Sequence, residues 1–318
     1  MKLKIICCIG ILSLFMGCKR ELTDLPQVDK SSAYGFVRKQ TSFGPRVPST
    51  EAHVNCKNWL VEQFKSHGME VETQEFTAQT FDGKTHPAFN IIARSNPKAK
   101  QTILLAAHWD SRPFADHDED SSKHKQAILG ADDGASGVAV LLELSRLINQ
   151  KKLNKVGVEI VLFDAEDYGN DNGSDPLSWC LGSQHWSKEA KAKGFKADYG
   201  ILLDMVGGTN PLYTYDEASK YYAPRVLEKV WSIAKEEGYE ANFKKILNGA
   251  ITDDHVFVNQ IAGIPMIDII NRPAGSKTGF VSHWHTHKDD DNSVDPNSLE
   301  MVTKILLKLL YLEDIDKI

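Results

Sequence analysis

The order of apolar segments predicts an α/β fold, a three-layer αβα sandwich around a mixed, mostly parallel sheet. Residues 156–163, 199–204 and 265–270 are apolar almost throughout, as expected for strands that helices cover on both faces. Segments with apolar residues every three or four positions alternate with them, most clearly 135–150 and 295–312. Such alternation of strand and helix is typical of a parallel sheet between two helical layers.

The other elements follow in chain order. The chain from residue 31 predicts a helix over 31–40 and a second over 49–67, where Ser49 and Glu51 suit a first helical turn. The last helix begins at Asp295-Pro296, a typical helix start. The remaining expected elements are strands near 69–78, 88–94 and 102–107, and helices near 183–193, 220–237 and 254–260.

Residues 1–17 resemble the signal peptide of a bacterial lipoprotein. Lys2 and Lys4 precede the apolar run 5–16, which is shorter than the ~20 residues of a transmembrane helix. The run ends Leu-Phe-Met-Gly before Cys18, which this resemblance makes the lipidated first residue of the mature chain. The alternative is an ordinary secretory leader that is cut elsewhere. We expect an exported protein on a periplasm-facing membrane, inner or outer, and held there only by lipid.

Behind the leader, residues 18–29 are polar and lack periodicity, which predicts a tether. No linker or repeat interrupts residues 30–318, so we expect them to form a single domain. The chain has 37 Lys and Arg against 43 Asp and Glu, a net charge of −6, which argues against a nucleic-acid partner. Besides Cys18 only Cys56 and Cys180 lie beyond the leader, too few for a disulfide scaffold. Whether these two form a bridge stays open, as does the oligomeric state.

Acidic residues and histidines recur where predicted strands end. Glu166 and Asp167 closely follow the strand 156–163, and adjacent carboxylates after an apolar strand are costly without a nearby cation. Groups beyond the carboxyl ends of several strands converge on one crevice in an open α/β sheet. The whole set therefore predicts a metal site, with candidates at His108, Asp110, Asp132, Asp133, Asp167, Asp204 and His285.

Each candidate also has a simpler explanation. Asp132 or Asp133 could cap the helix that follows, and Asp204 could bind loop amides. His283, His285 and His287 could belong to a solvated loop. Two long segments, 112–129 and 271–291, border these candidates, and since long loops in compact domains are usually functional or mobile, we expect them to form pocket walls.

The motifs around these residues resemble the zinc aminopeptidase superfamily and, within it, the animal-type glutaminyl cyclases and their bacterial relatives. The resemblance covers the chain from about residue 44 to its end. It depends on AHWDSR at 107–112, GADDGASG at 130–137, FDAEDYG at 163–169, LLDM at 202–205, DDH at 253–255, and WHT with a following Asp pair at 284–290.

The resemblance implies two possible ligand sets. In the cyclases, positions matching Asp133, Asp167 and His285 hold a single zinc ion. In the two-metal aminopeptidases, positions matching His108 and Asp204 complete a second site, which Asp133 bridges. All five residue types are present here, so ligand identity leaves both activities open. Asp167 stands where animal cyclases and many aminopeptidases have Glu, and its shorter reach would draw the ion towards its strand.

Aromatic residues favour the cyclase. The cyclases place tryptophans at positions that match Trp179 and Trp284, and Phe280 matches a third aromatic wall. Ordinary packing aromatics are the alternative. The resemblance also implies catalytic roles: Glu166 as general acid and base, Asp204 as the group that orients the substrate amine, and Asp253 as a partner near Glu166.

The expected function is that of a zinc-dependent glutaminyl-peptide cyclotransferase with one ion. It would convert the N-terminal glutamine of peptides or proteins to pyroglutamate and release ammonia. The alternatives are a two-zinc aminopeptidase that hydrolyses the first peptide bond and, in a different class, a lipid-anchored binding module without catalysis.

Overall fold

Six strands form the central sheet in the order β1-β2-β4-β3-β5-β8. The four strands β4, β3, β5 and β8 are parallel, whereas β1 pairs antiparallel with β2 and β2 antiparallel with β4. The predicted mixed, mostly parallel sheet is therefore confirmed. The strands are β1 (Glu70–Gln79), β2 (Thr85–Ser95), β3 (Gln101–His108), β4 (Val156–Phe163), β5 (Tyr199–Asp204) and β8 (Met266–Ile270).

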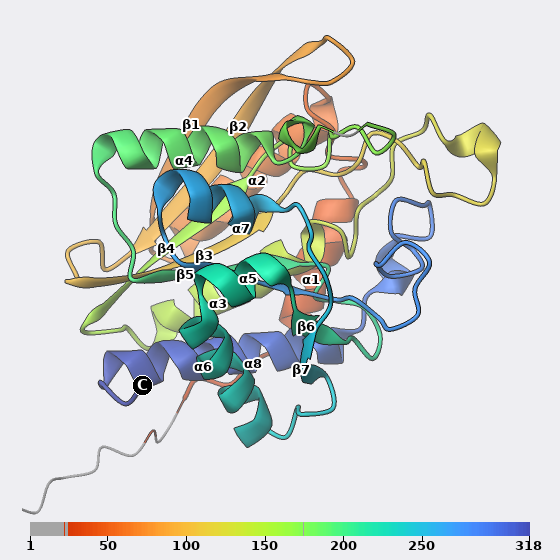
Figure 1. Cartoon of the computed structure of the whole chain (residues 1–318). Helices are drawn as coiled ribbons and strands as arrows, with labels where there is room; N and C mark the ends of the chain where they lie inside the picture. Colours follow the sequence, from red (N-terminus) through yellow and green to blue (C-terminus); the bar gives the residue numbers. More distant parts are fainter. Residues whose placement is uncertain (1–21, 23–24, 174) are drawn as a thin grey trace, which may run out of the picture.

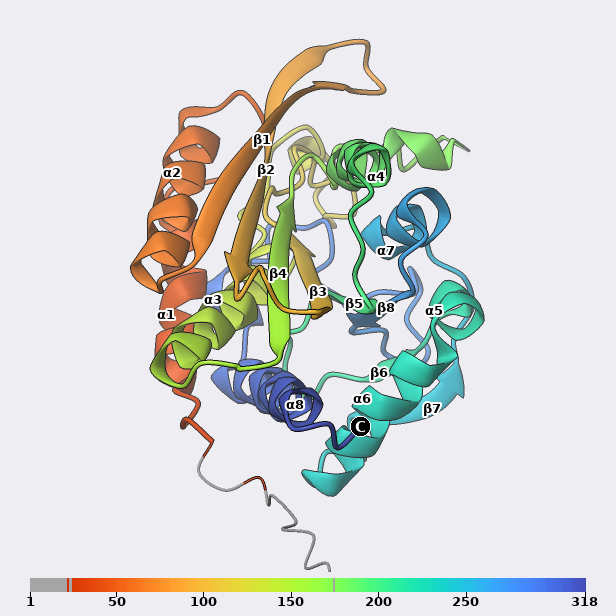
Figure 2. The same ribbon diagram turned by 90° about the vertical axis from the view of Figure 1, so that its left-hand side faces the viewer.

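Helices cover both faces of this sheet (Figures 1 and 2). One face carries α1 (Lys30–Thr41), α2 (Glu51–Ser66), α3 (Ala135–Gln150), α6 (Pro224–Glu236) and α8 (Pro296–Asp314). The opposite face carries α4 (Leu181–Lys193) and α7 (Asp254–Phe257), and α5 (Glu217–Tyr222) lies beside β8. These layers make the predicted three-layer sandwich.

The computed structural model describes residues 22, 25–173 and 175–318. The predicted signal peptide, the lipidation site Cys18 and most of the tether lie outside this part of the chain. Among the described residues no helix is both long and apolar enough to cross a membrane.

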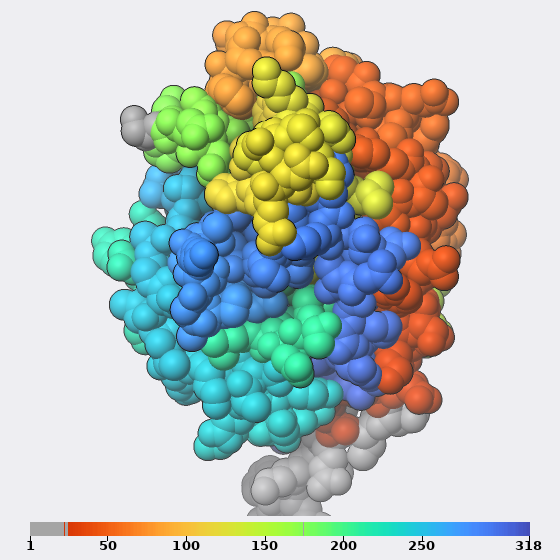
Figure 3. All heavy atoms as spheres, turned by 90° about the vertical axis from the view of Figure 1, so that its right-hand side faces the viewer, coloured from red at the N-terminus to blue at the C-terminus, as the bar shows by residue number. Residues whose placement is uncertain are grey.

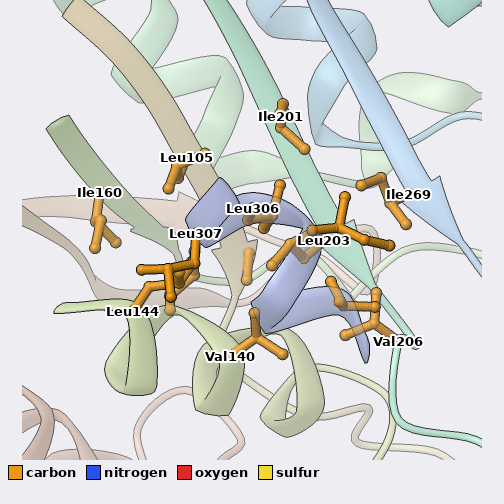
Figure 4. Packing of buried hydrophobic residues seen from close by; sticks show 14 of the residues in the cluster. Leu105, Val140, Leu144, Ile160, Ile201, Leu203, Val206, Ile269, Leu306 and Leu307 are labelled. Atoms are coloured by element: carbon orange, nitrogen blue, oxygen red, sulfur yellow. The ribbon is translucent and has the colours of Figure 1, made fainter. Parts of the chain in front are cut away.

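The core follows from the alternation of side chains along the buried strands. Leu105, Ile201 and Leu203 point to the face where Val140 of α3 and Leu306 of α8 pack (Figure 4). Their neighbours along the strands, such as Leu104 and Leu202, belong to the cluster under α4. Since both faces are buried, β3, β4, β5 and β8 are held firmly, and so are the groups at their ends.

The structure corrects several sequence-based boundaries. Thr50, not Ser49, caps α2, and Pro224 divides the predicted helix 220–237 into α5 and α6, since proline lacks the amide donor of a helix interior. The predicted helix 254–260 is α7 followed by a π-turn over Val258–Ala262. A small sheet of β6 (Tyr213–Tyr215) and β7 (Phe243–Leu247) was not predicted, because its strands are short.

A truncation in this core tests the layer assignment. Leu306→Ala should lower the free energy of unfolding by about 2–5 kcal/mol, since Leu306 is fully buried between α8 and the sheet. Leu177→Ala is the matched control, because Leu177 is 59% exposed. Urea unfolding of both variants measures the difference, and equal losses would contradict the packing described.

Candidate active site

The predicted metal ligands meet at the carboxyl ends of the parallel strands. His108 ends β3, Asp204 ends β5, and Asp167 follows β4 by four residues. Asp133 lies in the turn before α3, and His285 lies in the loop after β8 with a positive φ of 55°. The side chains of all five are nearly buried.

These residues form two groups that share Asp133. Its Oδ1 lies 2.9 Å from His108 Nε2, which lies 3.3 Å from Asp204 Oδ1. Its Oδ2 lies 3.8 Å from His285 Nε2, which lies 3.1 Å from Asp167 Oδ1. Within each group, the potential ligand atoms lie within 4.8 Å of one another.

Several of these atoms are better placed to bind a cation than to bind one another. Within the described part of the chain, three buried atoms find no hydrogen-bond partner, so the short contacts of His108 lack hydrogen-bond geometry: His108 Nε2, Asp167 Oδ2 and Asp204 Oδ1. Buried polar atoms without partners cost free energy. Imidazole nitrogens and carboxylate oxygens are ligands of Zn²⁺. Both groups therefore fit a metal ion.

Carboxylates behind the ligands bind the backbone amides that precede or carry the ligand side chains. Asp110 accepts from the backbone amides of Glu166 and Asp167 at 3.2 Å each, and it lies 3.4 Å from His108 Nδ1. Asp289 accepts from the amide of Asp133 at 3.1 Å. Such outer partners orient metal ligands.

Arg112 connects the ligands with the aromatic side of the site. Its guanidinium donates to the carbonyl oxygen of Asp167 at 2.9 Å and to Asp116 Oδ1 at 2.9 Å. Asp116 in turn lies 3.4 Å from His285 Nδ1. The same guanidinium lies 4.7 Å from the ring centroid of Trp179, a cation–π distance.

Glu166 is the group best placed to move a proton. Burial raises the pKa of Glu166 well above its ordinary value, and the charges of Asp167 and Asp253 raise it further. The Cys180 thiol donates to Glu166 Oε1 at 3.0 Å. A carboxyl group with a raised pKa can act as base and acid in turn.

Asp253 lies beside Glu166, as the resemblance implied: ligand-type atoms of Glu166, Cys180 and Asp253 lie within 4.8 Å of one another. Cys56 and Cys180 are both buried free thiols. The bridge that the sequence left open is therefore absent.

A cavity of 300 Å³, here called the catalytic cavity, opens onto these groups. Trp179, Phe280 and Trp284 form its aromatic wall. The ring centroid of Trp284 lies 3.7 Å from that of His285 and 4.6 Å from that of Phe280. The Trp179 ring is nearly parallel to the His285 ring, with 6.0 Å between their centroids. The predicted site residues that line the cavity are Asp133, Glu166, Asp167, Trp179, Asp204, Asp253, Phe280, Trp284 and His285.

The alternatives weighed for single residues are mostly wrong. Asp132 does not cap α3, whose N-cap is Gly134 without a side-chain cap. Its carboxylate instead binds the Gly207 amide at 2.7 Å and His283 Nε2 at 2.8 Å. His285 is buried, not solvated.

The two long loops both supply pocket walls, but of different extent. Segment 271–291 lines the catalytic cavity as predicted, whereas 112–129 contributes only His117, which lines a neighbouring cavity. The earlier loop also supplies Arg112 and Asp116 behind the ligands, and its charged tip projects from the surface, yellow in Figure 3. His108 lies below the cavity and does not line it.

The sequence analysis did not single out other cavity residues, including Met205, Ile251 and Arg272. Met205 belongs to the motif that contains Asp204, and Arg272 belongs to the segment expected to form a pocket wall, so both could have been found. Ile251 comes from a loop whose path no local pattern predicts.

The comparison with protein families assigns this architecture. A model described as Peptidase family M28 matches residues 90–310, which include every ligand candidate from His108 to His285. Among curated proteins, the glutaminyl-peptide cyclotransferase of Drosophila melanogaster is 25% identical over 293 residues, which cover 85% of this chain and 77% of the fly protein.

Solved structures are more similar. A Zn-dependent exopeptidase from Parabacteroides distasonis ATCC 8503 is 45% identical with a TM-score of 0.88, covering 91% of this chain and 99% of that chain. A Bacteroides thetaiotaomicron glutaminyl cyclase bound to N-acetylhistamine is 43% identical with a TM-score of 0.87, over the same 91% and 99%. These relatives include proteins named for each of the two activities.

The aromatic wall depends on a glycine. A Cβ added at Gly169 would lie 1.8 Å from the Trp179 ring, so Gly169→Ala should displace the indole and cost about 1–3 kcal/mol of stability. Near-ultraviolet circular dichroism and thermal unfolding measure both effects. Gly35→Ala, at a helical glycine with nothing within 4 Å, is the control and should leave both unchanged or slightly raise stability. A wild-type spectrum for Gly169→Ala would refute the contact.

Proposed function

Because the chain belongs to peptidase family M28, we propose for it one of the two reactions named among its relatives: zinc-dependent glutaminyl-peptide cyclotransfer. The enzyme converts the N-terminal glutamine of a peptide or protein to pyroglutamate and releases ammonia. The relatives named glutaminyl cyclase support this assignment at identities above 40%.

The observation that carries the proposal is the aromatic wall beside a buried Glu166. A glutamine side chain is small and neutral, and a cavity of 300 Å³ between Trp179, Phe280 and Trp284 suits it. Ring closure joins two atoms of one substrate, so no water nucleophile is needed. A wall that excludes water therefore helps this reaction, whereas hydrolysis requires water.

The metal belongs to the group Asp133, Asp167 and His285, and we propose one zinc ion there. Three protein ligands with a fourth position open are typical of catalytic zinc. When bound, the ion polarises the γ-carbonyl group of the glutamine as a Lewis acid.

The chain's own residues move the protons. The substrate α-amine has a reference pKa of roughly 8 and is mostly protonated at neutral pH, so a base must free its lone pair. The ammonium group first gives one proton to solvent, and Glu166 takes a second proton from the α-nitrogen as this nitrogen bonds to the side-chain carbonyl carbon. Glu166 then gives that proton to the amide nitrogen, whose bond to the carbonyl carbon breaks, so that ammonia leaves. Asp204 orients the α-amine towards the side-chain carbonyl carbon, and Asp253 stabilises the protonated form of Glu166.

The second candidate is a two-zinc aminopeptidase, in which Glu166 activates water. The complete group of His108, Asp133 and Asp204 favours it, since its atoms lie within 4.8 Å of one another. In the cyclase assignment the same Asp204 faces the amine. A non-catalytic binding module would not require a base beside the metal ligands.

The lipid anchor at Cys18 also remains a proposal. It would hold the domain by residues 18–29 at a periplasm-facing membrane, where peptide substrates with N-terminal glutamine reach it from solution.

Two substrates separate the candidates. The cyclase should convert Gln-β-naphthylamide to its pyroglutamyl form with release of ammonia and should leave Leu-p-nitroanilide intact. Coupled ammonia detection and mass spectrometry measure the first, and absorbance of p-nitroaniline measures the second. Cleavage of the leucine substrate without cyclisation would favour the aminopeptidase, and inactivity on both would favour the binding module.

Removal of the proposed base tests the mechanism. Glu166→Gln should lower kcat by about 10²–10⁴-fold, the usual contribution of a general acid or base, while the protein retains one zinc ion per chain. Steady-state kinetics and atomic emission measure these quantities. Glu189→Gln, at a glutamate of α4 whose side chain is 46% exposed, is the matched control and should be fully active. Full activity of Glu166→Gln would overturn its role.

A further inference from the structure

A second and larger cavity of 730 Å³, here called the side cavity, adjoins the catalytic cavity. Thr278, Phe280 and Trp284 line both, so the two cavities lie against the same part of the loop after β8. The other side is formed by residues 208–210 after β5 and by Asn292 and Ser293. The proposed reaction gives the side cavity no role.

The two cavities differ in charge. The catalytic cavity is lined by six carboxylates, from Asp133, Glu166, Asp167, Asp171, Asp204 and Asp253. None of the described residues that line the side cavity is acidic, although acidic residues outnumber basic ones in the chain. Its lining includes Lys277 and two histidines, His117 and His283.

Lys277 supplies the unbalanced positive charge. His283 contacts the carboxylate of Asp132 at 2.8 Å and His117 contacts that of Asp171 at 3.0 Å, so both imidazoles have acidic partners. Lys277 is exposed, and among the residues that the structure describes it forms no ion pair. A carboxylate that enters the side cavity can therefore pair with the Lys277 ammonium group, which is not already paired with an acidic side chain of the described residues.

The backbone of Gly208 and the side-chain amide of Asn271 form part of the wall of the side cavity. A Cβ at Gly208 would lie 2.9 Å from Asn271 Nδ2 and 3.2 Å from Asp132 Oδ2, the carboxylate that already pairs with His283, so the glycine leaves room beside the nearly buried Asn271 amide. Asn271 Oδ1 already accepts from the Leu212 amide at 2.9 Å, which turns its NH₂ group, a donor, to the Gly208 side. Donors and one cation suit an anionic, extended chain.

We propose that the side cavity binds the peptide segment that follows the N-terminal glutamine and selects acidic side chains in it. This inference deepens the proposed function and depends on it. An extended peptide advances about 3.3 Å per residue, so with the glutamine in the catalytic cavity the next two or three residues reach the adjoining cavity. The preferred substrates are peptides with Asp or Glu at the third or fourth position.

Matched peptides test the selection. Gln-Ala-Glu-Glu-Ala and Gln-Ala-Lys-Lys-Ala, both with amidated C-termini, differ only at positions three and four, where the charge is reversed. The wild type should favour the acidic peptide in kcat/KM, mainly through a lower KM, and the preference should weaken with salt. A second pair of peptides, Gln-Ala-Ala with a free and with an amidated C-terminus, measures the effect of a terminal carboxylate. That effect is then compared with the effect of the side-chain carboxylates.

Charge reversal at the cavity gives the decisive comparison. Lys277→Glu should lower the ratio of kcat/KM for acidic over basic peptide by at least about five-fold, since one attraction is replaced by a repulsion. Lys196→Glu is the matched control: Lys196 is exposed and precedes the amino end of β5, away from the carboxyl ends that carry the site. It should leave the ratio unchanged.

A steric variant provides an independent measurement. Thr209→Trp should raise KM for both pentapeptides, because Thr209 lines the side cavity, and Thr209→Val should not. All four variants should turn over Gln-β-naphthylamide as the wild type does, since that substrate has no following residues.

The outcomes separate the two proposals. Failure of the wild type on Gln-β-naphthylamide overturns the proposed function itself. Normal turnover of that substrate, with Lys277→Glu and Thr209→Trp both indistinguishable from wild type on the pentapeptides, overturns the side cavity as the peptide site.

Discussion

The concentration of buried negative charge at one edge of the sheet is the constraint on which the rest of the site depends. Asp133 shares one group of potential ligand atoms with Asp204 and another with Asp167, Glu166 directly precedes Asp167, and all four side chains are nearly buried. Carboxylates in such a setting must be neutralised by protons, hydrogen bonds or a cation. The same need explains both the metal ligands and the proton-carrying glutamate, because each relieves part of the same repulsion.

The carboxylates divide according to what faces them. Asp110 and Asp289 face backbone amides, which satisfy them and fix the turns. Asp133 and Asp204 both face the imidazole of His108, and neither contact has hydrogen-bond geometry. Glu166 faces a thiol, a weak donor that leaves it free to exchange a proton. Similar side chains therefore perform support, ligation and proton transfer, and their neighbours decide which.

Much of this arrangement could be predicted from the sequence, because strand ends are recognisable and parallel strands bring their ends together. His108, Asp204 and the Glu166-Asp167 pair were found in this way, and β4 and β5 have the bounds expected. The aromatic wall followed from motif resemblance, not from periodicity. Asp110 was found as well, but as a candidate ligand and not as an acceptor for backbone amides. The contact of Asp289 with the Asp133 amide could not be found, because it joins residues 156 positions apart. The division of the helix at Pro224 was available in the sequence, whereas β6 and β7 are too short to leave a pattern.

Arg112 contacts parts of the site that have different tasks. One guanidinium holds the Asp167 carbonyl oxygen, binds Asp116 behind His285, and lies over the Trp179 ring. The geometry of ion coordination and the shape of the substrate cavity are therefore not independent properties of this protein. A lineage that acquires a different substrate by moving the Trp179 side chain also changes the environment of two metal ligands, so the two traits must be inherited and altered together. Diversification would be easier on the other side of the cavity, in the loop after β8, where Lys277 and Thr278 form no hydrogen bond or ion pair with Arg112 or the ligands among the described residues.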